Sequence, residues 1–354
     1  MDSWLQFLTR QGAHLAQDKP AEVAHFETAA MQHSSQEALK AGFVAPLTDL
    51  GLIAASGEDA ASFLHSQLTN DVSHLGAAEA RLAGYCSPKG RLLATFLMWK
   101  TAAGLMLQLP REIQPAIQKR LQMFVMRSKV KLEDVSEQQV VLGLGGRAAA
   151  GVLMQWFPTL PATPYATAHS DSGSLVRVAD AYDAPRYQLL TSIATAQALW
   201  PVLTAWLQPV GNSAWRLSSI EAGVPQVTLP TQEQFVPQML NLELIGGVNF
   251  KKGCYPGQEI VARMQYLGKL KRRTMLAVLD ATGVAPGTEV FSSADPEQPC
   301  GMIVNAESKN TGQSACLVEM KIAALEDGTV HCGSAGGALL RFQSLPYALP
   351  ADAA

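Results

Sequence analysis

The pattern of hydrophobic residues changes once along the chain, near Arg273, and this change limits the folds that the chain can adopt. Before it, short strand-like segments are separated by longer segments whose apolar residues recur at helical spacing. After it, the apolar segments are short and are separated by turns with glycine and proline, which is typical of a small antiparallel barrel or sandwich. The chain of 354 residues is therefore predicted to contain an α+β region followed by a β domain.

One arrangement of strands and helices occurs twice in the α+β region. The first copy begins with a strand over residues 50–55 and a helix that includes Phe63, and a second helix covers roughly 111–126. The looser second copy ends in a helix over 193–207, despite Pro201. We therefore expect two related α+β lobes. The other predicted strands cover residues 82–86, 92–99, 105–109, 174–178 and 187–191, and the barrel strands cover 275–279, 289–291, 302–304, 315–320 and 339–342.

Three domains follow from these patterns. Residues 1–44 are rich in alanine, glutamine and histidine, so we expect an N-terminal extension there. Residues 45–268 hold the two lobes, which we expect to be interleaved, and residues 269–350 hold the barrel.

Two local signals refine this outline. Trp4, Leu5 and Leu8 fall on one helical face, which predicts a short docking helix within the extension. Ser56 and Asp59 precede the first helix of the α+β region with the spacing of a capping box.

Composition excludes several classes of protein. The five cysteines are an odd number and are widely spread, so we do not expect a disulfide framework. We expect the protein to be in a reducing compartment. The first residues do not have the layout of a signal peptide, and no apolar run is long enough to span a bilayer, so we expect a cytoplasmic protein without a membrane partner. The net charge of −3 allows nucleic-acid contact only through a local basic patch.

The strongest local motif is the run KKGCYPGQE, which places Cys254 between Gly253 and Gly257. Lys251 and Lys252 precede it, and a helix is expected to start just after it. Adjacent lysines and a helix N-terminus both favour a thiolate, so Cys254 is a candidate reactive thiol. A buried structural cysteine in a tight turn explains the same pattern, and spacing alone slightly favours that alternative.

A second motif is the run WRLSSIEAGVP, which contains Trp215 and Glu221. An indole can stack on a flat heterocycle, and a carboxylate can accept hydrogen bonds from a ring amine and amide. A core tryptophan near the end of a helix is the simpler explanation when the motif is taken alone.

A third candidate is a cationic set that can bind phosphates or a polyglutamate tail, although a solvated loop explains it equally well. The cationic set consists of Lys269, Lys271, Arg272 and Arg273.

The seven histidines show no metal-ligand spacing, so no metal site is expected.

Together these segments resemble the YgfZ family, bacterial relatives of the glycine cleavage T-protein. The motif KGCYPGQE is close to the family signature, and the resemblance extends over FLHSQLTNDV, RSKVKLEDVS and the run from Glu221 to Arg263, covering nearly all of residues 47–347. It implies a three-domain cloverleaf in which two T-protein-like α+β lobes, ferredoxin-like in layout, and a C-terminal barrel surround a hole that binds folate or tetrahydrofolate.

The resemblance also implies roles for particular residues. Trp215 falls on a position that the family uses for folate, and Glu221 falls where T-proteins hold the pterin ring with a carboxylate. Leu50 stands where YgfZ-type sequences commonly have a second tryptophan. Through the same motifs, Tyr255 and Arg263 are expected at the folate site. Cys254 is expected to be the functional thiol, assisted by Lys252.

One departure from the T-proteins bears on activity. T-proteins carry a pair of aspartates where this chain has Ala94 and Thr95, so the carboxylate that organises aminomethyl transfer is missing and enzymatic activity stays open. The resemblance implies an accessory protein that supports the assembly or repair of iron–sulfur enzymes, including tRNA-modifying methylthiotransferases, as a monomer with transient enzyme partners and indirect tRNA contact. The alternatives are a tetrahydrofolate-dependent aminomethyl or one-carbon transferase and a direct tRNA-binding module.

Overall fold

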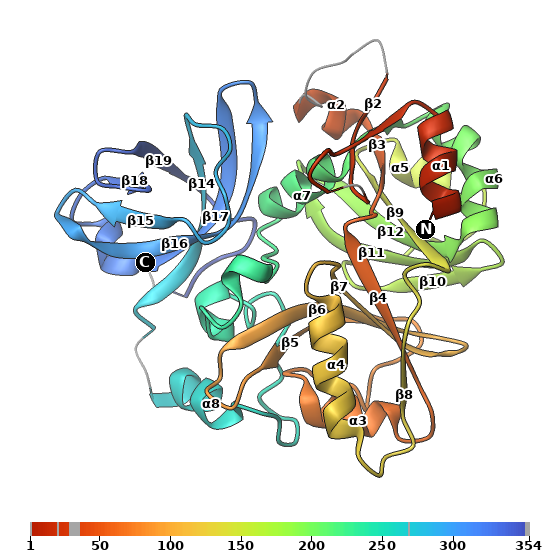
Figure 1. Ribbon diagram of the computed structural model, residues 1–354, viewed down its shortest axis with the longest axis horizontal. Coiled ribbons are helices and arrows are strands. Elements are labelled where there is room, and N and C mark those ends of the chain that lie inside the picture. The colour runs from red at the N-terminus through yellow and green to blue at the C-terminus, as the bar shows by residue number, and fades with distance from the viewer. Residues whose placement is uncertain (1, 20, 28–35, 268–269, 351–354) are drawn as a thin grey trace.

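The structure is a computed structural model, and it describes every residue except 1, 20, 28–35, 268–269 and 351–354. Three parts surround a common centre (Figure 1). One lobe lies at the bottom of the view, the second lobe at the upper right and the C-terminal barrel at the left. The predicted fold, two α+β lobes followed by an antiparallel barrel, is confirmed.

The first lobe is a five-stranded sheet in which successive side chains face opposite sides. Along β4, Ile53 and Ala55 pack with α3 and α4, whereas Leu52 faces the centre of the molecule. Both faces of the sheet are therefore buried. The elements are β4 (Leu50–Ser56), α3 (Ala60–Gln67), β5 (Ala80–Cys86), β6 (Leu92–Thr101), β7 (Gly104–Pro110), α4 (Gln114–Val125) and β8 (Lys131–Asp134), and the sheet order is β5-β6-β7-β4-β8.

The second lobe repeats this plan. Val140 and Leu142 of its first strand pack on the helix side, and Val141 faces the centre. Its second helix contains Pro201, as predicted. The elements are β9 (Gln139–Gly145), α5 (Ala149–Leu153), β10 (Thr167–Ser170), β11 (Gly173–Ala181), β12 (Ala184–Ser192), α6 (Ile193–Thr204) and β13 (Gln208–Pro209). Together with β3 (Phe43–Pro46) from the N-terminal segment, the strands have the sheet order β10-β11-β12-β9-β3-β13.

The N-terminal residues complete the second lobe. Trp4 and Leu8 are buried against it, and the indole of Trp4 meets that of Trp200 edge-on at 5.8 Å. The predicted docking helix is thus present. The strand β3 pairs with β9 and β13 inside the sheet of this lobe. The elements are α1 (Asp2–Arg10), β1 (Ala13–Leu15), β2 (Val23–Phe26), α2 (Gln36–Ala41) and β3 (Phe43–Pro46).

The expected capping box at α3 is wrong. Asp59 is the residue that precedes the helix, but its side chain caps no helical N–H. Its carboxylate instead accepts a 2.8 Å hydrogen bond from the backbone N–H of Lys129. That long-range contact uses the acceptor that a capping box would need.

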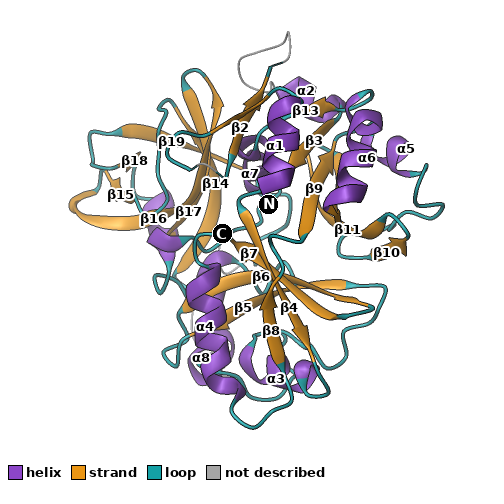
Figure 2. Ribbon diagram, turned by 45° about the vertical axis from the view of Figure 1, so that its right-hand side comes forward, coloured by secondary structure: helices purple, strands orange, loops and turns teal. Residues whose placement is uncertain are grey.

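A connecting region and a closed barrel follow the lobes (Figure 2). All pairs of neighbouring barrel strands are antiparallel, in the closed order β14-β17-β16-β15-β18-β19. Among the described residues, no helix is long and apolar enough to cross a membrane. The connecting elements are α7 (Asn212–Glu221), η1 (Leu229–Thr231), η2 (Pro237–Leu240) and α8 (Gln258–Leu267), and those of the barrel are β14 (Arg272–Leu279), β15 (Glu289–Ser292), β16 (Asp295–Asn310), β17 (Gln313–Lys321), η3 (Ile322–Leu325), β18 (Val330–Cys332) and β19 (Ala338–Gln343).

Candidate functional site

A cavity of about 480 Å³, here called the outer chamber, lies where the three parts meet. Its wall includes Glu22 from the N-terminal segment, Leu50 from β4, Ile220 from α7 and Glu307 from the barrel. Small-molecule sites usually measure about 300–1,000 Å³ and lie between domains. The outer chamber therefore has the size and position of a ligand site.

Arg216 joins the walls of the outer chamber. Its guanidinium contacts Asp49 at 2.7 Å, Glu22 at 2.5 Å and Glu307, three carboxylates from three separate regions of the chain. Burial alone would lower the pKa of Arg216, but the three carboxylates outweigh burial and raise it. The ion pairs hold the N-terminal segment, the first lobe and the barrel to α7.

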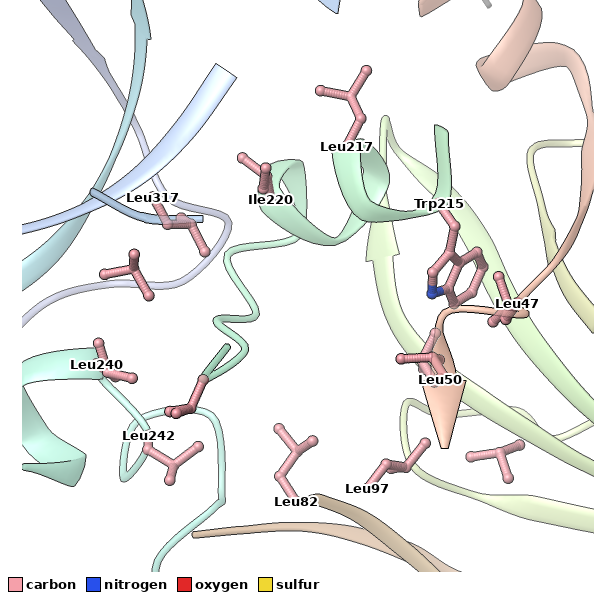
Figure 3. Packing of buried hydrophobic residues seen from close by; sticks show 14 of the residues in the cluster. Leu47, Leu50, Leu82, Leu97, Trp215, Leu217, Ile220, Leu240, Leu242 and Leu317 are labelled. Carbon is pink, nitrogen blue, oxygen red and sulfur yellow. The ribbon is translucent and has the colours of Figure 1, made fainter. Parts of the chain in front are cut away.

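A smaller cavity of about 60 Å³, here called the inner chamber, adjoins the outer one. The two chambers share the wall residues Ser219, Val224 and Gln226. Trp215, which is 4% exposed, lines only the inner chamber of the two. Figure 3 shows its indole beside Leu47 and Leu50, with the other labelled leucines and Ile220 placed around the same central region.

Close packing fixes the plane of the Trp215 ring. Gly143 of β9 lies against it, and a Cβ atom at that position would come within 2.5 Å of the ring. The guanidinium of Arg186 lies 4.8 Å from the ring centroid. Burial lowers the pKa of Arg186 to about 10, so the group is still a cation at neutral pH.

Three buried polar atoms of the inner chamber have no hydrogen-bond partner among the described residues. They are Nε2 of Gln108, Oε1 of Gln188 and the hydroxyl of Tyr165. Buried polar groups are nearly always paired, so unpaired groups that converge on one cavity indicate a site for a polar ligand or for water.

The structure places the two other expected folate residues of this region differently. Leu50 is buried and lines the outer chamber. Glu221, at the end of α7, forms an ion pair with Lys309 of the barrel at 3.3 Å and lines neither chamber. The carboxylate of Glu221 is thus already engaged by a cation.

One of the two positions of the missing aspartates lies at the same centre. Ala94 and Thr95 are both buried in β6, and Thr95 lines the inner chamber. The Thr95 hydroxyl accepts a 3.1 Å hydrogen bond from the backbone N–H of Val227. This position therefore supports the backbone of the chamber wall and offers no negative charge.

The Cys254 loop, residues 251–257, is a separate structure beside the first lobe. Cys254 itself is exposed and lines neither chamber. Lys252 donates hydrogen bonds to the carbonyls of His65 and of Leu68, the latter at 2.7 Å, at the C-terminal end of α3. A cation is favourable at this end of a helix, so Lys252 anchors the loop.

The surroundings of Lys252 include both ionisable and aromatic groups. Burial lowers the pKa of Lys252 to about 8, against the opposing effects of Asp71 and Cys254. Its ammonium lies 4.9 Å from the ring centroid of Tyr255, which is buried. Nδ1 of His65 lies 3.0 Å from Asp71. Burial is the main effect that lowers the pKa of His65, and the nearby charge of Lys252 lowers it further.

The two glycines of the loop differ in their constraints. Gly257 has φ +78°, and a Cβ there would come within 2.5 Å of the carbonyl of Ser87, so the turn against the β5–β6 hairpin requires glycine. A Cβ at Gly253 would meet only His65, at 3.6 Å, which is an ordinary contact. The helix expected after the loop is α8, from Gln258.

The expected basic residues are dispersed. Arg263 is exposed on α8 and lines neither chamber. Arg272 pairs with Glu319, and Arg273 is buried with Glu243, so both guanidinium groups are already engaged by carboxylates. Lys269 lies outside the described residues, and in the part of the chain that is described no cluster of side chains could hold a metal ion.

Sequence reasoning missed four residues of the inner chamber: Gln108, Tyr165, Arg186 and Gln188. The available signal was weak, because a single polar residue within an apolar strand, as in LMLQLP and RYQLLT, does not show which groups it meets in the folded chain. Tyr165 adds a conformational signal that only the structure shows, since its φ of 66° is rare for a bulky residue.

The architecture is that of the glycine cleavage aminomethyltransferases T. The enzyme of this type from Bartonella henselae superposes with a TM-score of 0.77 over 97% of this chain and 96% of its own, at 17% sequence identity, so the likeness concerns the fold. No protein-family model matches the chain.

Sequence relatives narrow the class. The tRNA-modifying protein YgfZ of Colwellia psychrerythraea is 35% identical over 331 residues, which cover 92% of this chain and 99% of the relative. Its counterpart from Klebsiella pneumoniae is 30% identical and is covered to 92%. The chain belongs to the YgfZ family.

Proposed function

We propose that this protein binds tetrahydrofolate in the two central chambers and assists tRNA-modifying enzymes that carry iron–sulfur clusters. The observation that carries the folate proposal is the pair of adjoining chambers at the junction of three domains, with a buried indole on the inner wall. A volume of about 480 Å³, whose wall combines apolar side chains with charged groups, suits the aromatic part of a folate and its polar substituents.

The residues of the chambers fit such a ligand. The plane of Trp215 offers a stacking surface, and the unpaired atoms of Gln108 and Gln188 offer a donor and an acceptor to a flat heterocycle. Leu50 contributes to the apolar wall of the outer chamber. Tyr255, Arg263 and Glu221 line neither chamber, so we propose no direct ligand contact for them.

The role in tRNA modification rests on the family. Relatives carry the name tRNA-modifying protein YgfZ, and we extend that role to this chain. The iron–sulfur clients follow from the resemblance stated for the cysteine motif. We propose Cys254, on its exposed loop, as the thiol that meets a client enzyme, and Lys252 as the cation that holds this loop.

Aminomethyl transfer is the less supported alternative. Transfer of this kind develops charge that a fixed group must stabilise, and Ala94 and Thr95 supply no charge at the expected place. A direct tRNA-binding module is also less supported, because Arg272 and Arg273 are engaged in ion pairs.

The test is complementation in cells that lack this protein. We expect the wild-type chain to restore methylthiolated nucleosides in tRNA and the activity of iron–sulfur enzymes, and we expect Cys254→Ala to restore neither. Cys316→Ala is the control, because that thiol is fully buried in the barrel. Full restoration by Cys254→Ala would remove the thiol from the proposal, and unchanged tRNA modification without the protein would remove the role itself.

A further inference from the structure

We propose that Gln108 and Gln188 form a pair, one from each lobe, that recognises the hydrogen-bonding edge of the bound heterocycle. The proposal rests on the proposed function, because it assigns the polar contacts of that same ligand. The groups that form hydrogen bonds with the ring are then neutral amides, and not the carboxylate of Glu221.

The two glutamines occupy corresponding places in the two lobes. Gln108 lies on β7, the third strand of the three consecutive strands in the first lobe, and Gln188 lies on β12, the third in the second. Each of these strands pairs with the first strand of its own lobe: Gln108 is opposite Leu52 of β4, and Gln188 is opposite Gly143 of β9. The repeated fold thus brings one amide from each sheet to the same central chamber.

Both amides are buried without full hydrogen bonding. Gln108 is 4% exposed and its Nε2 has no partner, while Gln188 is 7% exposed and its Oε1 has none among the described residues. Burying an unpaired donor and an unpaired acceptor costs free energy, and a ligand that pairs both recovers it. One donor and one acceptor on the same cavity are complementary to an edge that carries both a carbonyl and an N–H.

The surrounding groups are consistent with such an edge. The guanidinium of Arg186 donates hydrogen bonds to the carbonyl of Ala179 at 2.9 Å and to the hydroxyls of Ser218 at 2.8 Å and Ser219 at 3.1 Å. These three partners are neutral, and the buried guanidinium lies beside the chamber. Tyr165 holds a left-handed backbone conformation with an unpaired hydroxyl in the same wall. Residues in such rare conformations cluster at ligand sites.

The chemistry defines the class of ligand. A flat ring with a carbonyl and adjacent N–H groups, such as the aminopyrimidinone of a pterin, can stack near Trp215, accept from Gln108 and donate to Gln188. A chamber of about 60 Å³ admits only the edge of such a ring. The rest of the molecule then lies in the adjoining outer chamber.

Glu221 does not compete for this role. Its carboxylate pairs with Lys309 and lines neither chamber. A ligand that used Glu221 would have to displace that ammonium. Exchange of Glu221 for glutamine should therefore change ligand affinity little.

The experiment is a calorimetric titration of the full chain with tetrahydrofolate under reducing conditions. Methionine matches glutamine in length but cannot pair with the ring, so Gln108→Met and Gln188→Met are the test variants. We expect each to weaken binding by at least about tenfold. We expect Glu221→Gln and the exposed control Gln155→Met to stay within about threefold of the wild type.

Two further readouts separate the possible failures. The melting temperatures of both methionine variants should equal or exceed that of the wild type, because an unpaired polar group is removed. In each of them, p-aminobenzoyl-glutamate, which lacks the ring edge, should bind as it binds the wild type. Wild-type affinity for tetrahydrofolate in both methionine variants would overturn the assignment of the glutamines alone. A wild-type protein that does not bind tetrahydrofolate would overturn the proposed function itself.

Discussion

The central chambers and the Cys254 loop are built in opposite ways. The chambers draw their walls from residues between Lys19 and Glu307, and Trp215 within them is almost fully buried. The loop is a single run of residues, its cysteine is exposed, and one lysine fixes it to the end of a helix of the first lobe. The chambers therefore depend on the assembly of all three parts, whereas the loop depends on one lobe.

In the proposed function, this difference separates ligand binding in the chambers from contact with a client enzyme at the loop. The ligand would require the assembled domains, whereas the client would meet an exposed thiol. Substitutions in one region should therefore leave the other intact, and the following predictions test that separation.

The largest effect is expected from Arg216→Met. The substitution leaves Glu22, Asp49 and Glu307 close together without their shared cation, and unfolding should become easier by about 2–4 kcal/mol. Urea unfolding measures the change, with the exposed Arg127→Met as control. A loss below about 0.5 kcal/mol, the usual scale of a surface change, would show that this ion-pair cluster does not hold the parts together.

A smaller effect is expected from Gly143→Ala. The new methyl group would come within 2.5 Å of the rigid Trp215 ring, which should cost about 1–3 kcal/mol and weaken tetrahydrofolate binding. Gly151→Ala in α5 is the matched control, because a Cβ there meets nothing within 4 Å, and stability should be unchanged or slightly higher. Equal behaviour of the two variants in thermal melting and in titration would contradict the described position of Trp215.

The third prediction concerns the thiols. Cys254 should react with iodoacetamide at least about tenfold faster than Cys86, Cys300 and Cys316, since burial raises the pKa of each of those three thiols and keeps them protonated. Mass spectrometry of the native protein measures each rate, and Cys254→Ala should change stability by less than about 0.5 kcal/mol. Labelling of Cys254 at the rate of Cys300 would return it to a structural role.

The smallest effect is a pH dependence at Lys252. Burial lowers its pKa from 10.5 to about 8, so between these values the unfolded chain binds the proton that the folded chain has lost. More protons on the unfolded state mean that this group makes stability rise with pH in that window. The stability of the wild type relative to Lys252→Met should therefore increase from about pH 7.5 to about pH 9.5. The exposed neighbour Lys251→Met supplies the comparison; a pH-independent difference for Lys252→Met would place Lys252 in solvent.

Much of the fold could be predicted from local sequence. The strands over residues 50–55 and 92–99 and the helix of the first lobe were visible because apolar spacing directly reflects which side chains are buried. The barrel was visible from its short, turn-separated strands. The N-terminal segment was harder, since β3 is short and its place in the second sheet depends on β9, roughly a hundred residues away.

The site residues likewise differ in how far their partners lie along the chain. The Cys254 loop is a contiguous motif, so it could be recognised from the sequence alone. The ion-pair cluster of Arg216 could not be predicted, because its partners Asp49 and Glu22 are 167 and 194 residues away along the chain. The ion pair of Glu221 with Lys309 could not be predicted from the sequence for the same reason, since the two residues are 88 positions apart. Gln108 and Gln188 become meaningful only once the two sheets face each other across the inner chamber.

A folate bound against Trp215 is the central element of the proposed function, and one titration tests it most directly. Tetrahydrofolate added to the full chain should quench tryptophan fluorescence with saturation at one site, and Trp215→Ala should weaken the affinity measured by calorimetry by about 1–3 kcal/mol through loss of the stacking surface. An affinity that is the same in wild type and Trp215→Ala would contradict the placement of the ligand in the central chambers.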